Sequence, residues 1–258
     1  MRRPSPWRVS PLPLVVALAT LLAGGSARTE QVAAAGERPA SAGAAAQSPE
    51  GEAAPAATDT EGVVRLVGDP AMGATKAAVC GGCHGPDGNA PVPQFPKLAG
   101  QRSDYVEKQL RDFKAGQRSD PVMAGMAAML SDQDIADVAA YFESRAVRSG
   151  AGTTELAAAG ETLYSKGRPE NGLFPCIGCH GPNGEGANGA IEGGFPAVGG
   201  QNPEYLAKQL KSFRDSARAN DWKGIMQIVA SRMSDEDIAA VIAYLAALPR
   251  VQQGEAPR

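Results

Sequence analysis

The residues best suited to chemistry are cysteines and histidines that occur in two copies of one short motif. Residues 79–88 read VCGGCHGPDG, and residues 175–184 read PCIGCHGPNG. Together the two motifs contain all four cysteines and both histidines of the 258-residue chain. Each copy supplies two closely spaced thiols and an imidazole directly after the second thiol: Cys80, Cys83 and His84 in the first copy, and Cys176, Cys179 and His180 in the second.

Several kinds of chemistry use paired cysteines. A zinc site takes four ligands, usually from two separated pairs, and one ion shared by both motifs would leave each adjacent histidine unexplained. A thioredoxin-like redox pair needs a βαβ context that is absent here, and a disulfide within each motif also leaves the histidines unused. Cys-x-x-Cys-His is the signature of covalent haem attachment, in which both thiols bond to the porphyrin edge and the histidine ligates the iron. The sequence therefore predicts two covalently bound haem c groups.

The second axial position of each iron needs another ligand, and a methionine is expected because both histidines are already used. The first copy offers Met123, Met126 and Met129, and the second offers Met226 and Met233. When the copies are aligned at an offset of 103 residues, only Met123 and Met226 coincide. These two are the predicted axial ligands, although core filling is the more common role of methionine.

The remaining N–H of each proximal imidazole should donate to a group that fixes the orientation of the ring. The carbonyls of Pro96 and Pro196, which occupy equivalent positions of the two copies, are suitable acceptors. A plain loop proline is the alternative interpretation.

The two motifs belong to a longer internal duplication. Residues 95–113 match residues 195–213, and residues 130–142 match residues 233–245. The offset between the copies changes only between the matched blocks, where loops are expected. The duplication predicts two similar domains, 63–149 and 150–250, followed by a tail at 251–258.

Within each copy the periodicity is helical. Apolar residues recur at i, i+4 and i+7 in equivalent segments: Val106, Leu110 and Phe113, and Leu206, Leu210 and Phe213. Ser131 and Ser234 resemble N-caps of a later helix, because an aspartate lies three residues beyond each. A first helix is expected from Pro70 to Cys83, and its counterpart from about Thr154 to Ser165.

No segment alternates as a strand would, so the predicted fold class is all-α. Each domain would be a small helical fold with few aromatic residues and a thin core of its own. A large apolar cofactor at the centre would add to that core.

The N-terminus is predicted to direct export. Arg2, Arg3 and Arg8 precede an apolar run over 12–23 and then small residues, which is typical of a signal peptide, here 1–27. The run is short for a membrane span, which needs roughly 20 apolar residues, so an uncleaved anchor is the lesser alternative. The Ala-, Pro- and Gly-rich segment 28–62 is predicted to be a disordered leader. The mature protein is therefore expected in the periplasm.

The charge balance argues against nucleic acid as a partner. The chain has 25 basic and 28 acidic residues, and it contains no basic block. A slightly acidic surface without a basic patch does not attract a polyanion.

Several motifs together resemble those of a known family. Tandem CHGPDG and CHGPNG, with FPKLAGQ, YVEKQLRDF and LSDQDIADVAAYF, are similar to the class I c-type cytochromes and, more narrowly, to the dihaem cytochrome c4 family. The resemblance covers about residues 70–248. It implies two class I domains in which an aromatic residue of the C-terminal helix packs on a small residue of the first helix, with Gly73 and Gly160 as the small partners. Two features depart from the pattern: Ala197 stands where the first copy has Lys97, and the leader is long.

The resemblance also implies a function. It suggests a periplasmic electron carrier, not an enzyme, that accepts electrons from a quinol-oxidising complex and passes them toward a terminal haem–copper oxidase. Two alternatives are a cytochrome subunit docked on a dehydrogenase complex and a haem enzyme with one open iron site. For the enzyme, no further histidine or cysteine is left in the chain. Membrane association would come only through such partners or through an uncleaved leader.

The haem assignment predicts the mass of the exported protein. Because four thiols form thioethers in this scheme, intact-mass spectrometry under denaturing conditions should find the polypeptide plus two haems. A polypeptide mass without haem would contradict the assignment.

Overall fold

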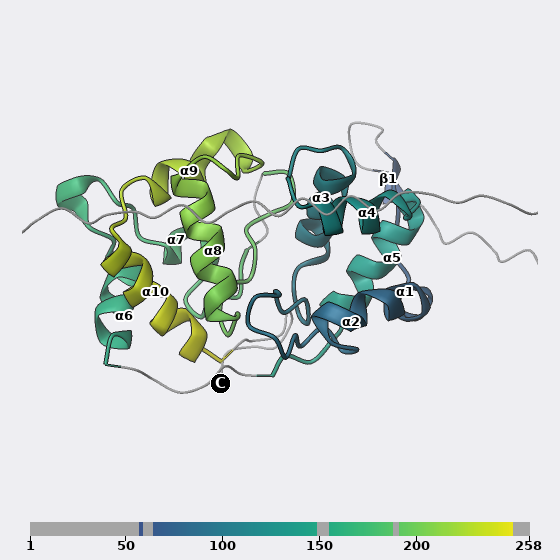
Figure 1. Cartoon of the computed structure of the whole chain (residues 1–258), viewed down its shortest axis with the longest axis horizontal. Coiled ribbons are helices and arrows are strands. Elements are labelled where there is room, and N and C mark those ends of the chain that lie inside the picture. Colours follow the sequence, from purple (N-terminus) through teal and green to yellow (C-terminus); the bar gives the residue numbers. More distant parts are fainter. Residues whose placement is uncertain (1–56, 59–63, 149–154, 188–190, 250–258) are drawn as a thin grey trace, which may run out of the picture. The chain divides into compact units, whose positions relative to one another are not determined.

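The computed structural model describes residues 57–58, 64–148, 155–187 and 191–249 (Figure 1). All of them belong to one compact unit of the chain, residues 51–258. The predicted signal peptide, nearly all of the leader and the tail lie outside the described residues. The boundaries at 63–149 and 150–250 therefore stay predictions.

Among the described residues, the regular elements are helices apart from one pair of two-residue strands, and loops connect them. The first copy contains, in order, β1 (Ala57–Thr58), β2 (Val64–Arg65), α1 (Pro70–Lys76), the 3₁₀ helix η1 (Ala77–Cys80), α2 (Gly81–His84), α3 (Ser103–Lys114), α4 (Pro121–Ala128) and α5 (Asp132–Glu143). The second contains α6 (Ala157–Lys166), η2 (Pro169–Asn171), α7 (Ile177–His180), α8 (Pro203–Arg214), η3 (Trp222–Gly224), α9 (Ile225–Ala230) and α10 (Asp235–Ala247). The strands β1 and β2 pair antiparallel. The all-α fold class is confirmed.

Two helices, α5 and α10, begin where their predicted capping residues place them. Ser131 and Ser234 each accept a bond from the backbone N–H three residues on, and the aspartate at that position bonds back to the cap. These reciprocal capping boxes satisfy two backbone donors at the start of α5 and α10. The helices α1 and α4 both begin with an Asp-Pro pair, in which the aspartate carboxylate accepts from the first backbone N–H groups.

The first helix differs from its prediction in one respect. The chain from Pro70 to His84 is helical, but it tightens into η1 between α1 and α2 instead of continuing as one α-helix. In the second copy the described helix begins at Ala157, three residues after the expected start, and a longer connection with η2 leads to α7. None of the described helices combines the length and apolar character that a membrane crossing needs.

In each copy, the first and last helices cross in close contact at a glycine (Figure 1). A Cβ atom at Gly73 would overlap the Asp137 carbonyl on α5 and lie 2.8 Å from Cβ of Tyr141. Gly160 of α6 has the same relation to Ala240 and Tyr244 of α10. The predicted pairing of a small residue with the helix that carries the aromatic motif is therefore confirmed in both copies.

The main cluster of mutually packed apolar side chains is larger in the second copy. Its buried cluster consists of Leu163, Tyr164, Leu173, Leu206, Met233, Ile238, Val241, Ile242 and Leu245. The corresponding cluster of the first copy consists of Ala77, Val138, Tyr141 and Phe142. In both, the first cysteine of the motif packs against the cluster from the side.

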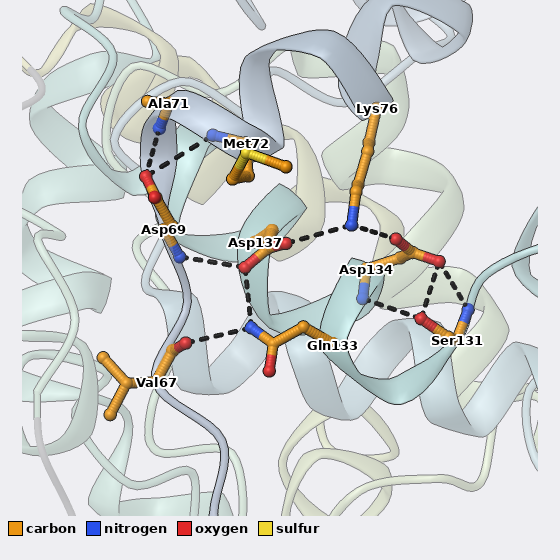
Figure 2. A network of polar contacts seen from close by, with 9 residues as sticks. All are labelled: Val67, Asp69, Ala71, Met72, Lys76, Ser131, Gln133, Asp134 and Asp137. Atoms are coloured by element: carbon orange, nitrogen blue, oxygen red, sulfur yellow. Dashed lines mark hydrogen bonds and ion pairs between the residues drawn. The ribbon is translucent and has the colours of Figure 1, made fainter. Parts of the chain in front are cut away.

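A polar network joins α1 to α5 in the first copy (Figure 2). The buried Asp137 carboxylate accepts from the Asp69 backbone N–H at 2.9 Å and from Lys76 Nζ at 3.1 Å. Gln133 donates to the same carboxylate at 2.8 Å, and Lys76 also pairs with Asp134. Two aspartates on one helix thus share one lysine of the other.

The second copy makes the same connection with different residues. Arg168 lies just after α6, and its two terminal nitrogens each donate a hydrogen bond to the Asp237 carboxylate, at 2.9 and 2.5 Å. A guanidinium that binds both carboxylate oxygens fixes the relative position of the two chain segments.

The lysine-centred network predicts a pH-dependent loss of stability in Lys76→Met. The hydrogen bond from Lys76, followed by that from Ser131, lowers the pKa of Asp134 from 3.8 to about 2. Burial would raise the pKa of Asp137, but the bonds from Asp69, Gln133 and Lys76 lower it. A carboxylate with a lowered pKa stabilises the fold above its unfolded pKa, and this contribution is lost as the pH falls through the folded value.

We therefore expect Lys76→Met to lower the free energy of unfolding by about 1 kcal/mol at pH 7, since solvent screens a partly exposed network. Between about pH 4 and pH 2 the difference from the parent protein should shrink. Urea denaturation followed by circular dichroism measures it. Lys166→Met, in the last turn of α6, is the control and should have little effect. A difference that stays constant down to pH 2 would contradict the role of the lysine.

Candidate functional site

The two Cys-x-x-Cys-His motifs adopt matching backbone conformations. Each histidine is the last residue of a short helix, α2 or α7, and the first cysteine of each motif is its N-cap. The following glycines, Gly85 and Gly181, both have φ of 79° and end the helix. This left-handed φ is easy only for glycine. The two thiols of each motif are thus held about one turn apart, with the imidazole directly after them.

Both histidines are buried and are held by the predicted acceptors. His84 is 7% exposed and His180 is 9% exposed. The Nδ1 atom of His84 lies 2.9 Å from the Pro96 carbonyl oxygen, and that of His180 lies 2.9 Å from the Pro196 carbonyl oxygen. A carbonyl can only accept, so Nδ1 carries the proton in both rings and the Nε2 lone pair is left for a metal. This prediction from the sequence is confirmed.

The environment favours the neutral imidazole that a metal requires. Burial lowers the pKa of His84 and of His180, although the bond to each proline carbonyl acts in the opposite direction. Neutral imidazole is the form that ligates metals.

The four thiols are unbridged. Burial raises the pKa of Cys80, and it raises the pKa of Cys176 to about 11. Among the described residues, which include both motifs, no group of three or more histidine, cysteine, aspartate or glutamate side chains is placed to hold a metal ion. A zinc site shared between the two cysteine pairs therefore finds no support.

The surroundings of the motifs fit a large flat apolar group. Val79 lies directly before Cys80 and is 59% exposed, and Phe174 lies two residues before Cys176 and is 66% exposed. Phe95 is also exposed, and its ring lies edge-on to His84 with centroids 6.2 Å apart. Exposed apolar side chains close in sequence to the free thiols, and in the first copy next to the buried imidazole, suit a porphyrin that would cover them. The donor set of each copy therefore fits a covalently attached haem.

Tyrosines hold the loop after each histidine, and sequence reasoning missed this role. Tyr141 of α5 donates to the Pro86 carbonyl at 2.9 Å. In the second copy the donor is Tyr164 of α6, which bonds the Gly181 carbonyl at 2.5 Å. The two tyrosines lie on non-equivalent helices, so the duplication gave no signal for this shared role.

The two predicted methionines occupy equivalent places. Met123 and Met226 are half-buried in the first turns of α4 and α9. The backbone N–H of each donates to an aspartate carboxylate, at 3.1 Å for Met123 with Asp120 and 2.6 Å for Met226 with Asp221. In contrast, Met233 is 5% exposed and belongs to the apolar core of the second copy. Ligation of iron by Met123 and Met226 stays a prediction.

The two copies are joined by polar contacts that sequence reasoning also missed. Gln101 and Gln201, identical at the offset of 100, each bond the backbone of the other copy. Arg118 and Arg218 each donate to a tyrosine and a glutamine of the other copy. Within its own copy, Arg118 stacks on Phe113 and Arg218 stacks on Phe213. Residues repeated in both copies outside the motifs were the signal that could have revealed this contact.

Comparison with known proteins agrees with this geometry. The family model of cytochrome c matches residues 71–146 and again residues 157–249. Cytochrome c4 of Pseudomonas aeruginosa is 48% identical over 188 residues, which are 72% of this chain and 92% of the relative. The crystal structure of reduced recombinant cytochrome c4 from Pseudomonas stutzeri superposes with a TM-score of 0.67 at 46% identity. It covers 71% of this chain and 100% of its own.

A third relative has a more specific description. The thiosulfate dehydrogenase electron acceptor of Stutzerimonas stutzeri (strain A1501) is 38% identical over 188 residues, which are 71% of this chain and 85% of the relative. Two matches to the cytochrome c model, one over each motif, mean two covalently bound haem c groups and a role in electron transfer rather than catalysis. The chain therefore belongs to the cytochrome c family, as a dihaem member of its cytochrome c4 group.

Proposed function

We propose that each haem is bound by one copy of the motif and closed by one methionine. Cys80 and Cys83 would hold the first haem with His84 and Met123 as axial ligands. Cys176 and Cys179 would hold the second, with His180 and Met226. The observation that carries this proposal is the pair of buried histidines whose Nδ1–H is bonded to a proline carbonyl, because this bond leaves the Nε2 lone pair of each ring available to bind iron.

A haem iron with both axial positions filled supplies one-electron chemistry and has no open position for a substrate. The protein's part is to keep the imidazoles neutral, oriented and shielded from water, which the burial of both rings achieves. The backbone N–H of Met123 donates to the carboxylate of Asp120, the N-cap of α4, and the N–H of Met226 donates to that of Asp221, which lies before α9. Each methionine thus lies in the first turn of its helix with an aspartate bound to its backbone N–H, which supports a common role for the two.

We propose the periplasm as the location, with residues 1–27 removed as a signal peptide and domains at 63–149 and 150–250. The proposed donor is a quinol-oxidising complex and the acceptor a terminal haem–copper oxidase. The family model matches lie inside the proposed domain boundaries and support them.

A second candidate donor has its own support. One relative is a thiosulfate dehydrogenase electron acceptor, and its match covers 71% of this chain. A periplasmic dehydrogenase could therefore deliver electrons to this protein, either in transient encounters or as a docked complex.

The ligand proposal predicts the near-infrared spectrum of the oxidised protein. A methionine thioether bound to ferric haem gives a weak charge-transfer band, and both haems should contribute to it. Met123→Ala and Met226→Ala should each remove about half of the intensity, because each removes one of two equivalent ligands. Met233→Leu, a change in the apolar core, is the control and should leave the band intact. An unchanged band in both alanine variants would refute the assignment.

The shuttle proposal predicts a free protein in periplasmic extracts. A carrier that exchanges between partners binds them weakly, so size-exclusion chromatography at physiological salt should elute the haem absorbance at the size of the monomer. Chromatography of the purified protein alone is the reference. Co-elution of all the protein with a dehydrogenase would instead favour the docked subunit.

A further inference from the structure

We propose that Gln101 and Gln201 are positioning residues that act across the two copies. Each glutamine bonds the peptide unit that holds the proximal histidine of the other copy, and it thereby sets the strength of that histidine's hydrogen bond. The inference rests on the proposed function, in which His84 and His180 ligate the two irons.

The connection runs through a single peptide unit in each direction. His180 Nδ1–H donates to the Pro196 carbonyl at 2.9 Å, and the N–H of the same peptide unit, that of Ala197, donates to Gln101 Oε1 at 2.9 Å. The other direction is its counterpart. His84 donates to the Pro96 carbonyl at 2.9 Å, and the Lys97 N–H donates to Gln201 Oε1 at 2.7 Å.

Each glutamine binds its target residue at two points. Gln101 Nε2 donates to the Ala197 carbonyl at 2.9 Å, and Gln201 Nε2 donates to the Lys97 carbonyl at 2.9 Å. A side-chain amide presents a donor and an acceptor together, so it matches the N–H and C=O of one residue. The backbone N–H and C=O of Lys97 and of Ala197 are therefore both bonded by one side chain of the other copy.

The orientation of each amide is determined by its surroundings. Gln101 Oε1 also accepts from the Arg102 N–H at 3.1 Å, and Gln201 Oε1 accepts from the Asn202 N–H at 2.9 Å. In each amide, one terminal atom faces two backbone N–H donors and the other faces a carbonyl. The first atom must therefore be the oxygen and the second the nitrogen. Gln101 and Gln201 are 5% and 4% exposed, so water does not compete for these bonds.

Polarisation through the peptide unit gives the arrangement an effect on the iron. When a peptide N–H donates to an acceptor, its carbonyl oxygen becomes more negative and a stronger acceptor in turn. The imidazole Nδ1–H bond is strengthened, which makes the ring a better electron donor to its metal. A better donor favours ferric iron, so each glutamine should lower the reduction potential of the haem in the other copy.

The two directions are not identical. Lys97 Nζ also donates to the Gly200 carbonyl at 2.8 Å, directly before Gln201, and to the Arg148 carbonyl at 3.1 Å. Ala197, at the equivalent position, has no side chain that could make such bonds. Gln201 is therefore held by an additional contact, and we expect it to have the larger effect on its target, His84.

The histidine content of the chain permits a direct test. Because the chain has only two histidines, ¹⁵N-histidine labelling of the reduced dihaem protein should give one Nδ1–H signal from each proximal ring. Phe95→Leu, which removes the ring next to His84, should identify the His84 signal. The substitutions are Gln101→Met and Gln201→Met, which keep the length of the side chain and remove both bonds.

The expected result is a crossed pattern. Gln101→Met should move the Nδ1–H proton of His180 to higher field and leave that of His84 in place, and Gln201→Met should do the reverse. In spectroelectrochemical titration, the equilibrium distribution of one electron between the haems should shift by two- to tenfold toward the haem in the copy opposite the substitution. Tenfold corresponds to about 59 mV for a one-electron couple.

The controls separate positioning from general loosening of the contact between copies. Tyr105→Phe and Tyr205→Phe each remove a bond to Arg218 or Arg118 across the same contact, but they do not touch the proline peptide units. They should leave both histidine signals and the electron distribution unchanged. Equal shifts of both signals in a glutamine variant, or a shift only in its own copy, would overturn the inference.

The same spectra distinguish this inference from the proposed function. If the Nε2 chemical shifts show that the rings are not bound to iron, the ligand proposal fails. If the rings are bound but the crossed pattern is missing, only the role of the glutamines fails.

If Gln101→Met and Gln201→Met do not accumulate as folded protein, the unsubstituted protein still gives a test. A scalar coupling across the hydrogen bond should link the Lys97 amide nitrogen to the Gln201 side-chain carbonyl carbon, and its absence would overturn the inference.

Discussion

A hydrogen bond from a buried imidazole to a proline carbonyl is the interaction on which each half of this protein depends. It determines which ring nitrogen carries the proton, and therefore which nitrogen keeps a lone pair that can bind a metal. The rest of each copy keeps the two partners of this bond in place. The glycine after the histidine ends the short helix, a tyrosine holds the next loop, and the crossing of the first and last helices supports both.

The two copies preserve this geometry with different residues. The first joins its terminal helices with Lys76 and two aspartates, whereas the second uses Arg168 and one aspartate. The tyrosine that holds the loop after the histidine comes from the last helix in the first copy and from the first helix in the second copy. Different side-chain contacts thus support the same helix crossing at a glycine in the two copies.

The contact between the copies explains a difference that the sequence left open. Ala197 replaces Lys97 in the second copy, which looked like a simple departure from the repeated pattern. The lysine side chain reaches the Gly200 carbonyl of the other copy, so it is part of the contact between the halves. The backbone of Ala197 is still bound by Gln101, because a backbone N–H and carbonyl are present whatever the side chain. The reciprocal bonding between the copies is therefore preserved at the backbone while the side chains differ.

Five features could be predicted from the sequence alone: the haem motifs, the duplication, the helical class, the capping boxes and the proline acceptors. Each of these depends on residues close in the chain, or on one copy repeating the other, so spacing and alignment were sufficient. Three contacts became visible only in the folded chain: Gln101 and Gln201 bond the opposite copy, Tyr164 takes the place of Tyr141 in holding the loop after the histidine, and Arg168 pairs with Asp237. Those contacts join residues that are far apart in sequence or not equivalent in the duplication. A buried polar group needs a hydrogen-bonding partner, but the residue type does not say which partner it has. The packing of the helices determines which group lies within reach.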